Sequence, residues 1–273
     1  MAGSVALRED HVDLPDGGRL FVASAGEGPP VIMIHGAGAG ASGAQHFAAN
    51  VEAFVAAGHR VIIPDLIGFG RSHKPVDDMG YPLERFTDAL IPMLDALDVG
   101  PSAIFGNSLG GAIGIDLALR APERVTHLVL LAPGALESPA VYGQLPAVER
   151  MRAIMQDGLS AETMRRMLES FVTDPAIVTD ELVEARLAAA LGQPPEVMAK
   201  LRLPDLTERL PGITQPVLVV WGGADPICPV EGAMKFVRLV KGARVLMLEG
   251  IGHWPMRERA ELVNDATLRF LSE

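Results

Sequence analysis

Ser108 stands at the centre of the sequence Gly106-Asn107-Ser108-Leu109-Gly110, between an apolar stretch and a segment typical of a helix. A tight strand-to-helix turn needs small residues two positions before and two after its central residue, and it pushes the central side chain outward. The N–H groups that follow such a residue lie at a helix N-terminus, where they can stabilise an oxyanion. The pattern therefore predicts that Ser108 is a nucleophile.

A serine nucleophile needs a base, and the base needs an acid that orients it. His253 lies in a loop directly after an apolar run, and Asp225 follows the preceding apolar run. If both runs are strands of a parallel sheet, their carboxyl ends meet at one edge of that sheet. We therefore predict a triad of Ser108, Asp225 and His253, in the chain order typical of hydrolases with a nucleophile elbow.

A glycine-rich loop follows the first short apolar run, with the sequence His35-Gly36-Ala37-Gly38-Ala39-Gly40. Acyl-transfer enzymes usually take a second oxyanion donor from a loop of this kind. We expect the backbone N–H groups of Ala37 and Leu109 to form the oxyanion hole.

Short and continuous apolar runs alternate with helix-like segments along most of the chain. The apolar runs are Val31–Ile34, Arg60–Ile63, Ser102–Phe105, His127–Leu131, Pro216–Trp221 and Arg244–Leu248. The helix-like segments are Ala44–Ala57, Leu83–Leu97, Leu109–Arg120, Val230–Val240 and Pro255–Leu271. Runs without polar alternation indicate strands buried on both faces, so we predict an α/β fold with a mostly parallel, doubly wound sheet.

Two segments depart from this alternation. Val5–Leu14 and Arg19–Ser24 flank Pro15-Asp16-Gly17-Gly18, which predicts an N-terminal hairpin. From residue 135 to residue 210 the pattern is helical, and Ser170–Val172 is its one strand-like run. We therefore expect residues 135–210 to form a helical lid inserted into a core made of residues 1–134 and 211–273.

The composition narrows the choice of partners. The chain has 273 residues and a net charge of -11, which disfavours nucleic acid and anionic membranes. Its single cysteine, Cys228, excludes an internal disulfide and fits a reducing cytoplasm. Met1–Asp13 lacks the pattern of a signal peptide, and no apolar run is long enough for a transmembrane helix. We expect a cytoplasmic protein that binds a small molecule and no metal.

These motifs resemble the α/β-hydrolase family over nearly the whole chain. Four stretches are similar more narrowly to the meta-cleavage product hydrolases, which split carbon–carbon bonds in the dienoates made by ring-opening dioxygenases. The stretches are residues 35–43, 106–111, 252–254 and 171–186. The resemblance implies an α/β-hydrolase fold with an inserted lid, a 2-hydroxy-6-oxo-hexa-2,4-dienoate-type substrate, no cofactor, and a homodimer or larger homo-oligomer.

The lid stretch carries the most specific likeness. Thr179 can cap a helix whose first turn holds two acidic residues, and Arg186 then lies on the same apolar face as Leu182 and Val183. An arginine on an inward face needs an anion. In the family the matching arginine holds the substrate's carboxylate, although Arg186 could instead pair with a buried acid of the protein.

The resemblance adds four further substrate-binding candidates. Asn107 is expected to fix the anionic end of the substrate together with Arg186, and Gly38 lies in the oxyanion loop. Trp254 is equally consistent with a packing role and with contact to the substrate. His46 stands where an asparagine is expected near the pocket wall.

Two other functions fit part of the sequence. A carboxylesterase or lactonase would share every catalytic residue, so only the pocket separates it from a carbon–carbon hydrolase. A dinucleotide-binding oxidoreductase is a remote alternative, because Gly38-Ala39-Gly40-Ala41-Ser42-Gly43 matches the Gly-x-Gly-x-x-Gly pattern and Asp65 follows the next apolar run. That alternative leaves Ser108, Asp225 and His253 unexplained.

Overall fold

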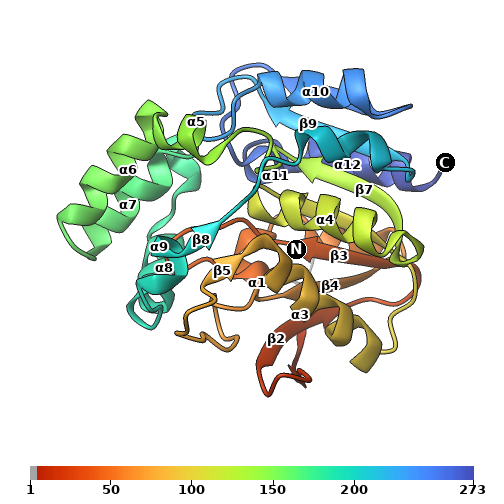
Figure 1. The fold of residues 1–273 in the computed structure, drawn as a ribbon, viewed down its shortest axis with the longest axis horizontal. Coiled ribbons are helices and arrows are strands. Elements are labelled where there is room, and N and C mark those ends of the chain that lie inside the picture. Colours follow the sequence, from red (N-terminus) through yellow and green to blue (C-terminus); the bar gives the residue numbers. More distant parts are fainter. Residues whose placement is uncertain (1–4) are drawn as a thin grey trace.

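The computed structural model describes residues 5–273, so residues 1–4 of the N-terminal segment Met1–Asp13 lie outside the described part. Eight strands form one sheet in the order β1-β2-β4-β3-β6-β7-β9-β10 (Figure 1). Their bounds are β1 Arg8–Asp13, β2 Arg19–Ala25, β3 Pro30–Ile34, β4 Arg60–Pro64, β6 Ser102–Asn107, β7 Val125–Leu131, β9 Val217–Gly222 and β10 Arg244–Leu248. Strand β2 is antiparallel to both of its neighbours, and every other pairing is parallel. The predicted fold class is confirmed.

The predicted N-terminal hairpin is also present. Strands β1 and β2 pair in register from Arg8 opposite Ser24 to Asp13 opposite Arg19. The Leu14 N–H donates to the Gly18 carbonyl over 2.8 Å and closes the turn. Gly17 adopts φ +81°, a conformation that strongly favours glycine.

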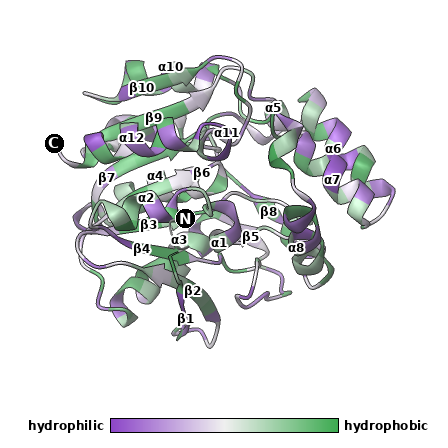
Figure 2. Cartoon of the chain, turned by 180° about the vertical axis from the view of Figure 1, so that it is seen from behind, coloured by the Kyte–Doolittle hydropathy of each residue, from purple (hydrophilic) through white to green (hydrophobic). Residues whose placement is uncertain are grey.

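Both faces of the central sheet are covered by helices, which explains the continuous apolar runs. In β3, Ile32 and Ile34 face one apolar cluster while Val31 and Met33 face another. The first cluster receives α3 (Leu83–Ala96), α4 (Leu109–Arg120) and α10 (Glu231–Leu239). The second receives α2 (Val51–Ala56) and α12 (Ala260–Leu271). Figure 2 shows mostly hydrophobic colours on the strands between these layers.

Two helices are shorter than predicted. The segment Ala44–Ala57 divides into α1 (Gly43–His46) and α2, because Asn50 lies between them and donates to the Met256 carbonyl and to Asn264. The segment Pro255–Leu271 divides into α11 (Pro255–Glu258) and α12, because Arg259 leaves the helical region with φ -137° and ψ 50°. The sequence pattern alone does not reveal these tertiary breaks.

Residues 135–210, here called the lid, connect β7 to β9. The green and cyan helices of the lid lie beside the sheet at the left of Figure 1, whereas its last residues return to the core, where the 3-10 helix Thr207–Gly212 packs against α4 and α10. The lid contains α5 Pro139–Gly143, α6 Pro146–Gln156, α7 Ala161–Glu169, a 3-10 turn at Pro175–Ile177, α8 Asp180–Leu191 and α9 Glu196–Ala199. Its apolar side chains, such as Met164 and Leu182, join the second cluster of the core. Among residues 5–273, no helix has the length and apolar content needed to cross a membrane.

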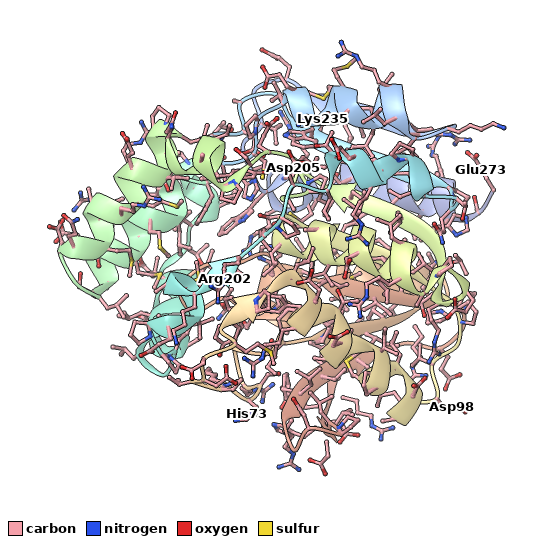
Figure 3. The ribbon with its side chains drawn as sticks, viewed as in Figure 1. His73, Asp98, Arg202, Asp205, Lys235 and Glu273 are labelled. Carbon is pink, nitrogen blue, oxygen red and sulfur yellow. The ribbon has the colours of Figure 1, made fainter. Side chains whose placement is uncertain are left out.

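One strand of the lid differs from the prediction. Ser170–Val172 is not a strand, since Ser170 caps the end of α7. Instead, the two-residue strand β8 (Leu201–Arg202) pairs with β5 (Tyr81–Pro82). Arg202, labelled in Figure 3, donates to the Met79 carbonyl over 3.1 Å. The returning lid chain is thereby attached to the core through a pairing too short to leave a pattern in the sequence.

Candidate active site

Ser108 occupies a strained turn between β6 and α4. Its backbone has φ 53° and ψ -113°, which few residues other than glycine adopt. A Cβ atom at Gly106 would lie 2.5 Å from the Gly110 carbonyl oxygen, and one at Gly110 would lie 1.9 Å from the Ile34 carbonyl oxygen. Both glycines are therefore required by backbone contact, as the tight turn predicted.

Asp225 and His253 form a buried pair at the ends of β9 and β10. The His253 Nδ1 and Asp225 Oδ2 atoms are 2.8 Å apart, and the two side chains are 4% and 0% exposed. The other carboxylate oxygen of Asp225 accepts the N–H groups of Ile227 and Cys228 at 2.8 and 2.9 Å. Because the carboxylate accepts from Nδ1–H, the second ring nitrogen keeps its lone pair and can take a proton.

The elbow and the histidine loop are joined through the residue before the serine. The Asn107 Nδ2 group donates to the His253 carbonyl over 3.2 Å and to the Leu131 carbonyl over 2.9 Å. Burial raises the pKa of the Cys228 thiol, which follows the aspartate loop, well above its usual value. The elbow, the histidine loop and the aspartate loop are thus joined at one edge of the sheet.

The glycine-rich loop after β3 packs against the elbow. A Cβ atom at Gly36 would lie 3.2 Å from the Ser108 Cβ atom. In the described part of the chain, neither the Ala37 N–H nor the Leu109 N–H donates to a backbone or side-chain acceptor. Both groups are therefore available to an oxyanion formed next to Ser108.

His35 and Asp65 stabilise this loop. His35 donates from Nδ1 to the Gly36 carbonyl over 2.8 Å and accepts the Leu66 N–H at Nε2 over 3.0 Å. Burial lowers the pKa of His35 to about 4, so the ring is neutral. The Asp65 carboxylate accepts the N–H groups of Gly43 and Arg71 at 2.7 and 2.8 Å. Both ring nitrogens of His35 and both carboxylate oxygens of Asp65 are thus engaged with backbone groups.

The lid helix α8 lies directly on the glycine-rich loop. A Cβ atom at Gly40 would lie 1.9 Å from the Arg186 carbonyl oxygen, and the Gly40 N–H donates to the Gln193 side chain over 2.8 Å. The expected cap is present, since Thr179 Oγ1 accepts the Leu182 N–H. Helix α8 therefore fills the space that a dinucleotide fingerprint would leave for a pyrophosphate, which disfavours the oxidoreductase alternative.

Arg186 points inward from α8 and is only 3% exposed. Its Nη1 atom has no hydrogen-bond partner and would lie 3.9 Å from a Cβ atom at Gly38. Burial, together with the nearby Arg257 cation, lowers the pKa of Arg186 to about 10. Among residues 5–273 no carboxylate forms a salt bridge with it, so the geometry does not support the alternative of a structural ion pair.

Among the other substrate-binding candidates, Trp254 lies beside Arg186, whereas Asn107 and His46 contact each other. Trp254 is buried, stacks on Phe171 with ring centroids 5.1 Å apart, and lies 5.5 Å from the Arg186 guanidinium carbon. The Asn107 Oδ1 atom lies 2.9 Å from His46 Nε2. Since its amide nitrogen bonds two carbonyl groups, Asn107 is engaged with the protein through both ends of its carboxamide.

Sequence reasoning missed the residues that couple the lid to the histidine loop. Glu258 accepts the Gly252 N–H at 2.9 Å and the Thr173 N–H at 2.8 Å. The His253 N–H donates to the Phe171 carbonyl over 2.7 Å. Glu258 lies five residues after His253, but a glutamate in a helical stretch is too common to have drawn attention. In the described part of the chain, no group of His, Cys, Asp and Glu side chains is arranged to hold a metal ion.

Comparison with known proteins agrees with this geometry. The alpha/beta hydrolase family matches residues 31–266. The chain is 34% identical to a 2-hydroxy-6-oxo-6-phenylhexa-2,4-dienoate hydrolase of Burkholderia cepacia, over 93% of this chain and 91% of that protein. It is 33% identical, with the same coverage, to a 2-hydroxy-6-oxononadienedioate/2-hydroxy-6-oxononatrienedioate hydrolase of Comamonas testosteroni.

A solved structure extends the similarity to the whole fold. The meta-cleavage product hydrolase of Pseudomonas fluorescens IP01 superimposes with a TM-score of 0.83 and 28% identity, over 98% of each chain. The protein is therefore a hydrolase that belongs to the alpha/beta hydrolase family, within the group that contains the meta-cleavage product hydrolases.

Proposed function

We propose that this protein hydrolyses a carbon–carbon bond in a 2-hydroxy-6-oxo-hexa-2,4-dienoate-type product of aromatic ring cleavage. The observation that carries the proposal is Arg186, a buried guanidinium that has an unpartnered nitrogen and lies beside the oxyanion loop. A substrate carboxylate would supply the missing anion, whereas a neutral ester would leave the charge buried and unpaired. The names of the relatives support the same substrate class.

The proposed reaction begins with ketonisation of the dienol. Arg186 holds the carboxylate at C1, and His253 moves the proton of the C2 hydroxyl to C5. The product of this step has ketones at C2 and C6. No cofactor is needed, because the conjugated chain of the substrate itself can accept an electron pair.

Cleavage then follows the serine pathway. Ser108 attacks the C6 ketone while His253 takes its proton, and the N–H groups of Ala37 and Leu109 bind the oxyanion. The C5–C6 bond breaks, its electron pair is delocalised onto the C2 oxygen, and His253 returns the proton to the leaving dienoate. Water activated by His253 hydrolyses the acyl-enzyme, while Asp225 keeps the imidazole in the required tautomer.

Two assays on purified protein test the proposal. We expect the wild type to bleach the dienoate chromophore with a much larger kcat/KM than it shows for p-nitrophenyl acetate, and Ser108→Ala to lose both activities. Fast ester hydrolysis with no bleaching would assign the protein to the carboxylesterases or lactonases. Bleaching at the wild-type rate by Ser108→Ala would refute the assigned nucleophile.

Other parts of the proposal rest on the sequence alone. Residues 135–210 would act as the lid over a core of residues 1–134 and 211–273. A cytoplasmic location, the lack of a cofactor, the lack of nucleic acid as a partner and a homo-oligomeric state remain predictions. The substituent on the C6 ketone is left open, because the relatives' names include both a phenyl group and a second carboxylate.

A further inference from the structure

The chain enters and leaves the lid at one place. The Leu206 N–H donates to the Ala135 carbonyl over 2.7 Å, so the departing segment is bonded directly to the entering segment. Residues 135–137 and 205–207, here called the lid root, therefore lie side by side at the base of the lid. The ammonium group of Lys235, on the core helix α10, contacts both segments, and the reaction described above does not use it.

All three hydrogens of the Lys235 ammonium group have an acceptor in the lid root. The Nζ atom donates to the Leu136 carbonyl, to Glu137 Oε1 over 2.7 Å and to Thr207 Oγ1 over 3.3 Å. The first two acceptors belong to the entering segment, whereas Thr207 belongs to the departing segment. One side chain of the core thus holds both segments of the lid at the same time.

The third acceptor is oriented by an acidic neighbour. The Thr207 hydroxyl donates to Asp205 Oδ1 over 2.5 Å, which leaves its lone pairs to accept from Lys235 (Lys235 and Asp205 are labelled in Figure 3). The Lys235 and Glu137 side chains are 23% and 24% exposed, so solvent screens their ion pair less than it screens a fully exposed one. Hydrogen bonds of a charged donor are stronger than neutral ones, so these contacts restrain the lid root.

The lid root is attached to the nucleophile elbow on its other side. The Gly134 N–H, directly before Ala135, donates to the Ser108 carbonyl over 2.9 Å. Ala135 has φ +62°, a left-handed conformation that is costly for an alanine. Such a conformation persists where its surroundings impose it, and here the carbonyl groups of Ala135 and of the next residue are both hydrogen-bonded. The lid root is thus held between the elbow and α10.

Helix α10 is itself a rigid support. It begins at Glu231, at the end of the loop that carries Asp225. A Cβ atom at Gly232 would lie 2.5 Å from the Trp221 ring and 3.2 Å from Leu136 Cδ1. The helix therefore packs closely on both β9 and the lid root, and a side chain on such an element is held more precisely than one on a loop.

We infer that Lys235 is a positioning residue, which fixes the lid root against the core and thereby sets the position of Arg186 on the lid relative to Ser108 on the sheet. This inference rests on the proposed function, in which a dienoate has to reach both residues at the same time. A small neutral ester needs only the elbow and does not depend on the position of the lid. Loss of the Lys235 contacts is therefore expected to affect dienoates selectively.

Hydrogen exchange measures the attachment of the lid root. In Lys235→Met, which keeps the aliphatic stem and removes every donor, the Leu206 amide should exchange roughly tenfold faster than in the wild type. Exchange in β6, which reports global unfolding, should change much less. Thr207→Val, which removes only one acceptor, should accelerate Leu206 exchange by about threefold. Lys235→Arg should restore most of the protection, and Arg238→Met, a change at an exposed residue of the same helix, should leave it unaltered.

Steady-state kinetics test the consequence for the site. The ratio of kcat/KM for the dienoate to kcat/KM for p-nitrophenyl acetate should fall by about tenfold in Lys235→Met and recover in Lys235→Arg. Taking this ratio within one protein cancels any general loss of folded enzyme. An unchanged ratio, or Leu206 exchange equal to that of the wild type in Lys235→Met, would overturn the assignment. Failure of the wild type to turn over any dienoate would instead refute the proposed function, and hydrogen exchange would still decide whether Lys235 holds the lid root.

Discussion

Replacing Arg186 by methionine should separate the two substrate classes and also stabilise the protein. Methionine keeps much of the length and the apolar contacts of the buried side chain but removes its charge. Because Arg186 has no acidic partner among the described residues, the substitution breaks no ion pair in the free enzyme. The substitution is expected to lower activity only toward substrates whose carboxylate has to be bound.

The expected sizes of the loss in dienoate turnover and of the gain in stability follow from the burial of Arg186. Removing one member of a buried charge pair typically costs about 2–5 kcal/mol, which corresponds to a loss of roughly 30- to 5,000-fold in kcat/KM for the dienoate. Burial lowers the pKa of Arg186 from 12.5 to about 10, a folded-state penalty of roughly 3 kcal/mol for the charged form. The variant should recover part of this penalty at every pH well below 10, where arginine is charged in both the folded and the unfolded chain.

For each variant, the assays measure the turnover of two substrates and a urea unfolding curve. Arg186→Met should lose dienoate turnover, keep p-nitrophenyl acetate turnover within about threefold, and require more urea to unfold than the wild type. Arg150→Met is the matched control, because Arg150 is an exposed arginine of the same lid. Equal losses for both substrates, or a less stable Arg186→Met protein, would refute the reasoning that this cation is kept for an anionic ligand.

Three other substitutions test the framework of the site. Asp225→Asn should lower kcat for any substrate by about 10⁴-fold, since an amide nitrogen next to His253 Nδ1 favours the wrong tautomer, and stopped-flow bleaching would measure it. Glu258→Gln should lower the free energy of unfolding by about 1–3 kcal/mol and also lower kcat, because the lid and the histidine loop lose shared hydrogen bonds; a Glu261→Gln control should change neither quantity. Gly110→Ala should yield little folded protein, whereas Gly100→Ala, whose Cβ would meet nothing within 4 Å, should express and melt like the wild type; normal melting of Gly110→Ala would contradict the close approach to Ile34.

Local sequence signals were sufficient for the parts of the fold that depend on local chemistry. The apolar runs predicted six strands of the central sheet, because strands covered on both faces need no polar alternation. The spacing around Ser108 predicted the elbow, because only glycine tolerates the backbone contacts at Gly106 and Gly110. The inward position of Arg186 followed from helical periodicity and a capping threonine.

Features created by distant contacts could not be read in this way. The break at Asn50 depends on a hydrogen bond to Met256, which is 206 residues away. The pairing of β5 with β8 involves two residues in each strand, too few for a pattern. The hydrogen bond between Asn107 and His46 depends on the orientation of the Asn107 amide, which is fixed by carbonyl groups at the end of β7 and in the histidine loop. The sequence therefore identifies the reactive groups, whereas the hydrogen-bonding state of the pocket requires the folded structure.

The most direct test of the central claim is product analysis after turnover of 2-hydroxy-6-oxo-6-phenylhexa-2,4-dienoate in ¹⁸O-labelled water. Cleavage of the C5–C6 bond predicts equal amounts of benzoate and 2-hydroxypenta-2,4-dienoate, with one oxygen of the benzoate derived from water. A substrate that remains intact, or that only converts to its keto tautomer without releasing benzoate, would contradict the account.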